Sequence, residues 1–257
     1  MNFTPKCPSK VLALLVLGVT TAALAQSFNV QTFGNFKHMM QSGNTAAQVK
    51  LQDIRQTKGT WGIGALAGLK GEIILVDGTM LVTPGSDVQG KTTASKANDE
   101  AVLWASAEVQ KWQQVAVLKN MSQAEFETFL VQQAKLLNLN LDHPFAYRVQ
   151  GSYTHLIWHV VTGEKDATSA NTSHQQDHNS AGSHSGHANN QTGQKVFRNP
   201  TLTGNLVGMY SGKALEGVIS HPGERFHAHF VDNALAVSGH VDQYNVQSGS
   251  TLFLPVN

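Results

Sequence analysis

A strictly alternating stretch near the C-terminus constrains the fold more than any other part of the sequence. Residues 225–231 read Arg-Phe-His-Ala-His-Phe-Val. Successive side chains of a β-strand point to opposite faces, so this strand has one apolar face and one face with two histidines. The apolar face comprises Phe226, Ala228 and Phe230, and the other comprises His227 and His229. Such a strand belongs to a sheet that covers a hydrophobic core on one side.

A second strand returns after Asp232-Asn233 and adds a third histidine, His240. If Asp232-Asn233 is a two-residue turn, Val231 pairs with Ala234, and His240 lies one diagonal step from His227 on the same face. A longer loop with an even number of residues keeps His240 on the same face as His227, whereas an odd number places it on the opposite face. Three neutral imidazoles on rigid strands are typical of a zinc site. Copper, nickel, iron and manganese stay open, as does a solvated sheet face without metal.

The charge balance excludes one broad class of function. The chain carries 18 Lys and Arg against 17 Asp and Glu, a net charge of +1. It therefore lacks the basic excess with which proteins bind nucleic acid through the phosphates, and we expect no nucleic-acid partner. The length of 257 residues suits one large domain or two small ones.

The first 25 residues predict a secretory signal peptide. Lys6 and Lys10 precede an apolar run over residues 11–25, which ends in the small-x-small pattern of residues 23–25. This run is shorter than the roughly 20 apolar residues of a membrane-spanning helix. We therefore expect an exported protein, periplasmic or secreted, with no membrane segment after cleavage. Removal of this segment also removes Cys7, so any metal site must use His, Asp or Glu.

The remaining pattern predicts a β-rich protein with one or two helices. Residues 71–82 read as a hairpin around Asp77-Gly78, and further strands are expected near residues 101–105, 112–118 and 145–161. One helix begins at a capping box formed by Ser122 and Glu125. Its expected core face comprises Phe126, Phe129, Leu130, Ala134 and Leu137.

A polar tract over residues 164–195 separates two parts. It contains no apolar residue larger than alanine, and we expect a His-rich flexible loop. The predicted organisation is an α+β part over residues 26–163, with a mixed sheet, and a small barrel-like β part over residues 196–257 that carries the metal. The tract contains His174, His178, His184 and His187, which either capture metal weakly or have no function.

Four segments, distributed over roughly residues 29–255, resemble the acetolactate decarboxylase family. The Gly-rich stretch 62–78 and the stretch 143–151 are similar to its Gly-rich and arginine-containing segments. Residues 206–210 match the strand that leads to its metal motif. Residues 226–241 reproduce its three-histidine zinc motif, including the ten residues between the second and third histidines.

The resemblance implies a zinc-dependent carbon–carbon lyase that converts 2-acetolactate, a small keto acid, to acetoin and carbon dioxide. It implies that His227, His229 and His240 hold the metal, which acts as a Lewis acid on the keto acid. It implies catalytic roles for Arg148, as a partner of the substrate carboxylate, and for Glu72, as the group that moves a proton. Two closely packed subdomains and a possible homodimer are also implied.

The chain departs from the family pattern at three points. No Asp or Glu follows Asp242, although family members carry a catalytic glutamate near the C-terminus. Ala65 replaces a threonine, and His159 stands where a second arginine usually follows. Loss of a general acid or base typically slows a reaction by about 10²–10⁴-fold, so activity is expected to be slow, altered or lost unless another group substitutes. The candidates for this are Glu216, Glu224 and the carboxylate of Asn257.

Two further functions stay open on the sequence alone. The first is an exported metal-binding protein that keeps this fold but has lost or altered its catalysis. The second is a metal-dependent hydrolase with Glu72 as its general base. Retention of Glu72 and Arg148 favours the lyase, because a metal carrier needs neither residue.

Overall fold

A computed structural model describes residue 1, residues 26–165 and residues 192–257. The predicted signal peptide and most of the predicted His-rich loop, residues 166–191, lie outside the described residues. The predicted loop is too long at both ends, because residues 164–165 and 192–195 belong to two long strands. No helix in the described part of the chain is long and apolar enough to cross a membrane.

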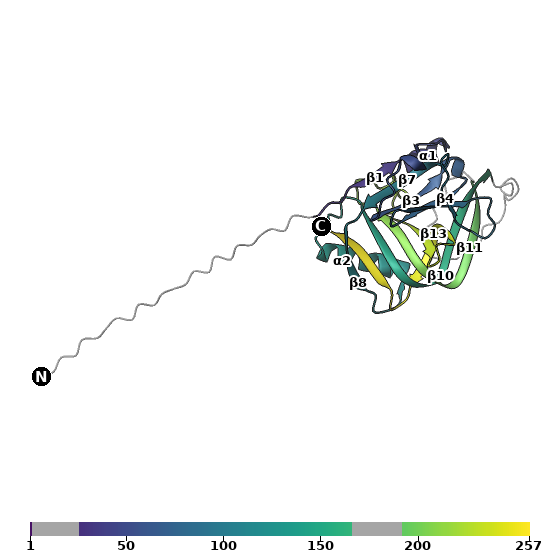
Figure 1. Cartoon of the computed structure of the whole chain (residues 1–257). Coiled ribbons are helices and arrows are strands. Elements are labelled where there is room, and N and C mark those ends of the chain that lie inside the picture. Colours follow the sequence, from purple (N-terminus) through teal and green to yellow (C-terminus); the bar gives the residue numbers. More distant parts are fainter. Residues whose placement is uncertain (2–25, 166–191) are drawn as a thin grey trace, which may run out of the picture.

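Two antiparallel seven-stranded sheets build the described fold, with two α-helices beside them (Figure 1). The predicted mixed sheet is wrong, because every pairing between strands is antiparallel. The first sheet comprises β1 (Val30–Phe33), β2 (Val49–Lys50), β3 (Thr60–Leu66), β4 (Gly71–Val76), β5 (Thr79–Pro84), β6 (Thr93–Ala94) and β7 (Glu100–Glu108). The second comprises β8 (Lys111–Ala116), β9 (Met121–Ser122), β10 (Phe145–Lys165), β11 (Thr192–Tyr210), β12 (Phe226–Asp232), β13 (Ser238–Val246) and β14 (Thr251–Val256).

The chain passes from one sheet to the other between β7 and β8. The long strand β10 therefore pairs with β11, β13 and β14, whereas the sequence pattern predicted that it belongs to the first part of the chain. The pairings β10–β11, β11–β12, β12–β13 and β13–β10 close a ring of four strands. The second sheet is thus larger than the small C-terminal unit that the polar tract suggested.

Two local predictions are confirmed in detail. In the hairpin of β4 and β5, Val76 pairs with Thr79, and Asp77 and Gly78 both have positive φ, as a type I′ turn requires. The helix α2 (Gln123–Leu136) begins at Ser122, and both hydrogen bonds of the capping box with Glu125 are present. The remaining helical elements are α1 (Phe36–Ser42) and the short 3₁₀ turns η1 (Leu51–Asp53) and η2 (Ala67–Leu69).

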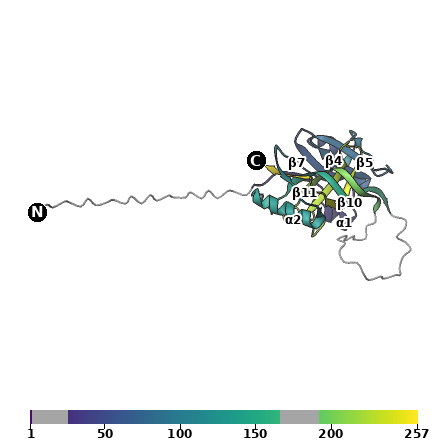
Figure 2. The same ribbon diagram turned by 90° about the horizontal axis from the view of Figure 1, so that it is seen from below.

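The second sheet has a different neighbour on each face. Its outer face packs on α2, whose Phe126, Leu130 and Ala134 are fully buried there, and Figure 2 shows α2 on the side away from the first sheet. The alternation of β12 places Phe226 and Phe230 against this core. Its inner face packs on the first sheet through a core of residues from both sheets: Trp61, Ile63, Ile74, Ala105, Ala107, Ala146, Val207, Met209 and Val231. The histidines of β12 therefore point into the space between the two sheets.

Candidate metal centre

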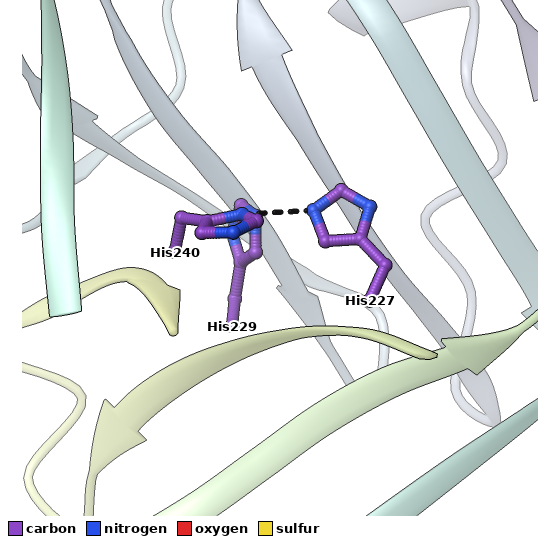
Figure 3. A group of neighbouring side chains, drawn as sticks. All are labelled: His227, His229 and His240. Carbon is purple, nitrogen blue, oxygen red and sulfur yellow. Dashed lines mark hydrogen bonds between the residues drawn. The ribbon is translucent and has the colours of Figure 1, made fainter. Parts of the chain in front are cut away.

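His227, His229 and His240 converge on the inner face of the second sheet. His229 on β12 pairs directly with His240 on β13. Nε2 of His227 lies 3.0 Å from Nδ1 of His240, and one nitrogen from each ring lies within 4.8 Å of the others. Figure 3 shows the three side chains pointing toward one another. The predicted cluster is confirmed as a group that is able to hold a metal ion.

The turn that joins these strands differs from the prediction. Val231 pairs with Ser238, not with Ala234, so the connection is the loop of residues 232–237. The side chain of Asp232 stabilises this loop, because its Oδ1 accepts hydrogen bonds from the backbone N–H groups of Ala236 and Val237. Because the loop has an even number of residues, all three histidines lie on the same face of the sheet, as predicted.

Burial keeps the three imidazoles neutral. It lowers the pKa of His227 to about 4, and it also lowers the pKa values of His229 and His240 well below the ordinary value. The charge of His159 and the neighbouring histidines act in the same direction. A neutral imidazole is the form that binds a metal, so these groups need not release a proton at neutral pH.

The hydrogen bonds around the cluster also suit a metal. Nδ1 of His227 lies 2.6 Å from the backbone oxygen of Ile219, so Nδ1 carries the proton and Nε2 keeps its lone pair. The imidazole of His229 has a hydrogen bond with the backbone of Ile73, and its Nε2 faces Glu72. A backbone partner of this kind orients a histidine ring and leaves its other nitrogen to bind a metal. The donor set fits zinc and does not exclude other divalent metals.

Glu72 reaches the cluster from the opposite sheet. It lies on β4, only 4% of its surface is exposed, and its Oε2 is 3.7 Å from Nε2 of His229. The backbone N–H of Val161 donates to Oε1 at 3.3 Å. Burial raises the pKa of Glu72 to about 7, against the opposing effect of the charge of His159. A carboxyl group with this pKa exchanges a proton readily near neutral pH.

His159 and Asp242 also lie at the cluster, and no sequence motif assigned them to the site. Nδ1 of His159, on β10, lies 2.8 and 2.9 Å from the two carboxylate oxygens of Asp242, on β13. The ring of His159 lies 4.7 Å from that of His240. Burial works to lower the pKa of His159, but Asp242 and Glu72 outweigh it and raise that pKa. The replacement of an expected arginine by His159 was the signal that pointed to this position.

Arg148 lies on the same face but outside the cluster. One cross-strand row of paired residues joins Arg148, Val207, His229, His240 and His159. Arg148 is two strands from His229, about 10 Å at the backbone. Its guanidinium carbon lies 3.7 Å from the ring centre of Phe253 and 4.7 Å from that of Trp61. Because Phe253 is on β14, on the other side of β10 from Val207, the guanidinium leans away from the histidines.

No hydrogen bond or ion pair within the described residues joins the candidate substitutes for the C-terminal glutamate to the three histidines. Glu216 is exposed and pairs with Arg225, 3.4 Å from carboxylate oxygen to Nε. The backbone N–H of Asn257 donates to Gln26 at 3.1 Å. The histidines of the predicted loop, from His174 to His187, lie outside the described residues.

Comparisons with known proteins agree with this fold. The sequence profile of the family described as alpha-acetolactate decarboxylase matches residues 30–256. A search of curated proteins finds no match. The crystal structure of alpha-acetolactate decarboxylase from Bacillus subtilis strain 168 is similar, with a TM-score of 0.67 and 16% sequence identity over 89% of this chain and 86% of that one.

A second similar structure comes from Staphylococcus aureus. It is described as a protein of unknown function similar to alpha-acetolactate decarboxylase, and it has a TM-score of 0.62 and 17% identity over 89% of this chain and 86% of that one. At these identities the structures show the shared β-rich fold, while the profile covers most of the sequence. The chain belongs to the alpha-acetolactate decarboxylase family.

Proposed function

We propose that this protein is a metal-dependent carbon–carbon lyase that converts 2-acetolactate to acetoin and carbon dioxide. One observation carries the proposal. A buried carboxyl group, Glu72, lies 3.7 Å from His229 in a cluster of three neutral imidazoles, in a chain of the decarboxylase family. A protein that only binds metal needs the three histidines, but it does not need a buried carboxyl group from the opposite sheet.

The three histidines would hold a divalent metal, with zinc as the first candidate. When bound, the metal supplies a Lewis acid that polarises the ketone of a 2-hydroxy-3-keto acid. In the reaction the bond between C2 and the carboxylate breaks, carbon dioxide leaves, and the electron pair moves toward the ketone oxygen. Addition of one proton at C2 completes acetoin.

Glu72 is the residue best placed to supply that proton. Its pKa of about 7 means that both protonation states are populated at neutral pH, as an acid–base group requires. Its position between two packed sheets also limits the access of water, which keeps the proton transfer under the control of the protein. Arg148 is not assigned to this step, since its guanidinium carbon lies over the rings of Phe253 and Trp61, outside the cluster.

The experiment is an assay of purified, zinc-loaded protein with racemic 2-acetolactate. We expect acetoin above the spontaneous rate, its loss on chelation, and loss of both bound zinc and activity in His227→Ala. The matched control is His155→Ala, because His155 is an exposed histidine on β10 outside the cluster. Bound zinc without acetoin would contradict the lyase and favour a metal-binding protein. Unchanged zinc in His227→Ala would contradict the metal site.

Export and a homodimer belong to the proposal and need tests of their own. The N-terminal pattern supports cleavage after Ala25. Expression of the full chain, followed by N-terminal sequencing of the product, should give a chain that begins at Gln26 outside the cytoplasm. An uncleaved chain that stays in the cytoplasm would contradict export, and sedimentation of the purified protein tests the dimer.

A further inference from the structure

His159 is buried and pairs with the partly exposed Asp242, and the proposed reaction has not used this pair. Only 9% of the His159 side chain is exposed, and both carboxylate oxygens of Asp242 lie within hydrogen-bond distance of its Nδ1. Asp242 follows His240 by two residues on β13, where the register with β10 is irregular, and its contact with His159 places its carboxylate on the inner face of the sheet. The pair is therefore built into the wall of the candidate metal centre.

The register places His159 directly beside the cluster. His229 pairs with His240, and His240 pairs with His159, so three neighbouring strands each present a histidine at the same level. The rings of His159 and His240 lie 4.7 Å apart. Residues paired in this way have side chains within contact distance, so a molecule held at the three histidines also meets His159.

Asp242 decides which nitrogen of His159 is available. A carboxylate accepts hydrogen bonds, so Nδ1 of His159 carries a proton and donates it to Asp242. Nε2 makes no hydrogen bond within the described residues and is the nitrogen left to bind a ligand. A hydroxyl group suits Nε2 in either protonation state, because a hydroxyl both donates and accepts hydrogen bonds.

We propose that His159 binds the hydroxyl group of a 2-hydroxy acid held at the metal centre, and that Asp242 is the positioning residue that orients His159. This inference rests on the proposed function and names the substrate feature that the site selects, which is the hydroxyl group at C2. Recognition of this kind discriminates between ligands, because a ligand without the hydroxyl leaves Nε2 of the nearly buried His159 side chain without this partner.

The experiment measures binding, so it does not depend on turnover. Calorimetry of the zinc-loaded protein compares 2-hydroxyisobutyrate with isobutyrate, which has the same carboxylate but no hydroxyl. The readout is the dissociation constant of isobutyrate divided by that of 2-hydroxyisobutyrate, which measures the preference for the hydroxyl group. We expect His159→Phe, which keeps a ring beside His240, to reduce this ratio about tenfold, the value of one hydrogen bond. His155→Phe, the same change at an exposed position of β10, should leave the ratio unchanged.

Asp242→Asn provides a second and milder test. The Asp242 side chain is 36% exposed, so the amide is tolerated, while Nδ1 of His159 loses its carboxylate. We expect a smaller fall in the same ratio, with zinc content unchanged in both variants. An unchanged ratio in His159→Phe, or an equal weakening of both ligands, would overturn this inference and leave the lyase intact. The absence of any hydroxyl preference in the unmodified protein would contradict both proposals.

Discussion

The cross-strand row that joins Arg148 to His229 and His240 has a charged side chain at one end and neutral side chains at the other. At one end, Arg148 keeps its positive charge and lies over the rings of Phe253 and Trp61. At the other end, His229 and His240 are held neutral, and Glu72 is shifted toward its neutral form. The row has the same backbone geometry throughout.

The difference lies in what each end offers to a ligand. The rings of Phe253 and Trp61 contact the Arg148 guanidinium, while its buried Nε makes no hydrogen bond within the described residues, so this end offers a cation and a donor. The histidine end keeps three neutral imidazoles with nitrogen lone pairs. A site that binds metal and substrate needs such unsatisfied groups, and the fold pays for them in stability.

Loss of a metal ligand should have the largest effect. In His229→Ala we expect zinc to be lost and acetoin formation to fall to the spontaneous rate, because two imidazoles form an incomplete site. Zinc content by elemental analysis and acetoin by colorimetric assay give the two readouts. Retention of zinc at one ion per chain would mean that the histidine end is not the metal centre.

Glu72→Gln separates metal binding from proton transfer. The amide keeps the shape of the side chain but cannot exchange a proton, so we expect kcat to fall by about 10²–10⁴-fold. Zinc content should stay unchanged, since Glu72 is not among the three ligands. A kcat within threefold of the unmodified protein would mean that another group transfers the proton.

The sequence was sufficient to predict that the three histidines share one face, because their signal is local. The alternation of residues 226–230 fixes which side chains share a face, and this result survived an incorrect turn, since the true loop also has an even number of residues. The hairpin at Asp77-Gly78 and the helix at Ser122 were predictable for the same reason.

Contacts between distant strands were harder to predict. Nothing near Glu72 in the sequence indicates that it meets His229 across two sheets; the family resemblance supplied that residue. The resemblance also favoured Arg148, whose environment depends on β14 and β3. The pair of His159 and Asp242 depends on the β10–β13 pairing, which closes only after the chain has formed β11 and β12.

The pH dependence of stability should show the unusual pKa of Glu72. A carboxyl group with a folded pKa of about 7 and an ordinary value of 4.5 binds more protons in the folded state between these pH values. Its contribution to the free energy of unfolding therefore falls as pH rises from 4.5 to 7, by at most about 3 kcal/mol. The histidines act in the opposite direction, because the pKa of His227 is lowered to about 4.

Glu72→Gln isolates this contribution. Urea unfolding of the metal-free protein at pH 5 and pH 7.5 should show that the variant gains stability relative to the unmodified protein as pH rises. The comparison cancels the contributions of His227, His229 and His240, whose pKa values do not depend on Glu72, whereas the pKa of His159 falls somewhat in the variant. A difference that does not change with pH would mean that the carboxyl group titrates normally.

Gly239→Ala should disturb the histidine end through the backbone. A methyl group at Gly239 would lie 2.5 Å from both the backbone oxygen of His159 and the ring of Trp158, so β13 must shift away from β10. We expect a loss of about 1–3 kcal/mol in the free energy of unfolding, with weaker zinc binding. Gly249→Ala is an unsuitable control because Gly249 has positive φ. Ala236→Gly, in the exposed loop, tests whether any backbone change near the hairpin has this effect.

Arg148→Met should have the smallest effect on activity and so tests the comparison most directly. The methionine keeps much of the apolar stem but removes the cation from the rings of Phe253 and Trp61. We expect a loss of about 1–2 kcal/mol in the free energy of unfolding and less than a threefold change in kcat/KM. If Arg148 instead bound the substrate carboxylate, KM would rise by more than tenfold while stability changed little. Urea unfolding and steady-state kinetics on the same preparation decide between a cation that holds the two sheets together and one that binds substrate.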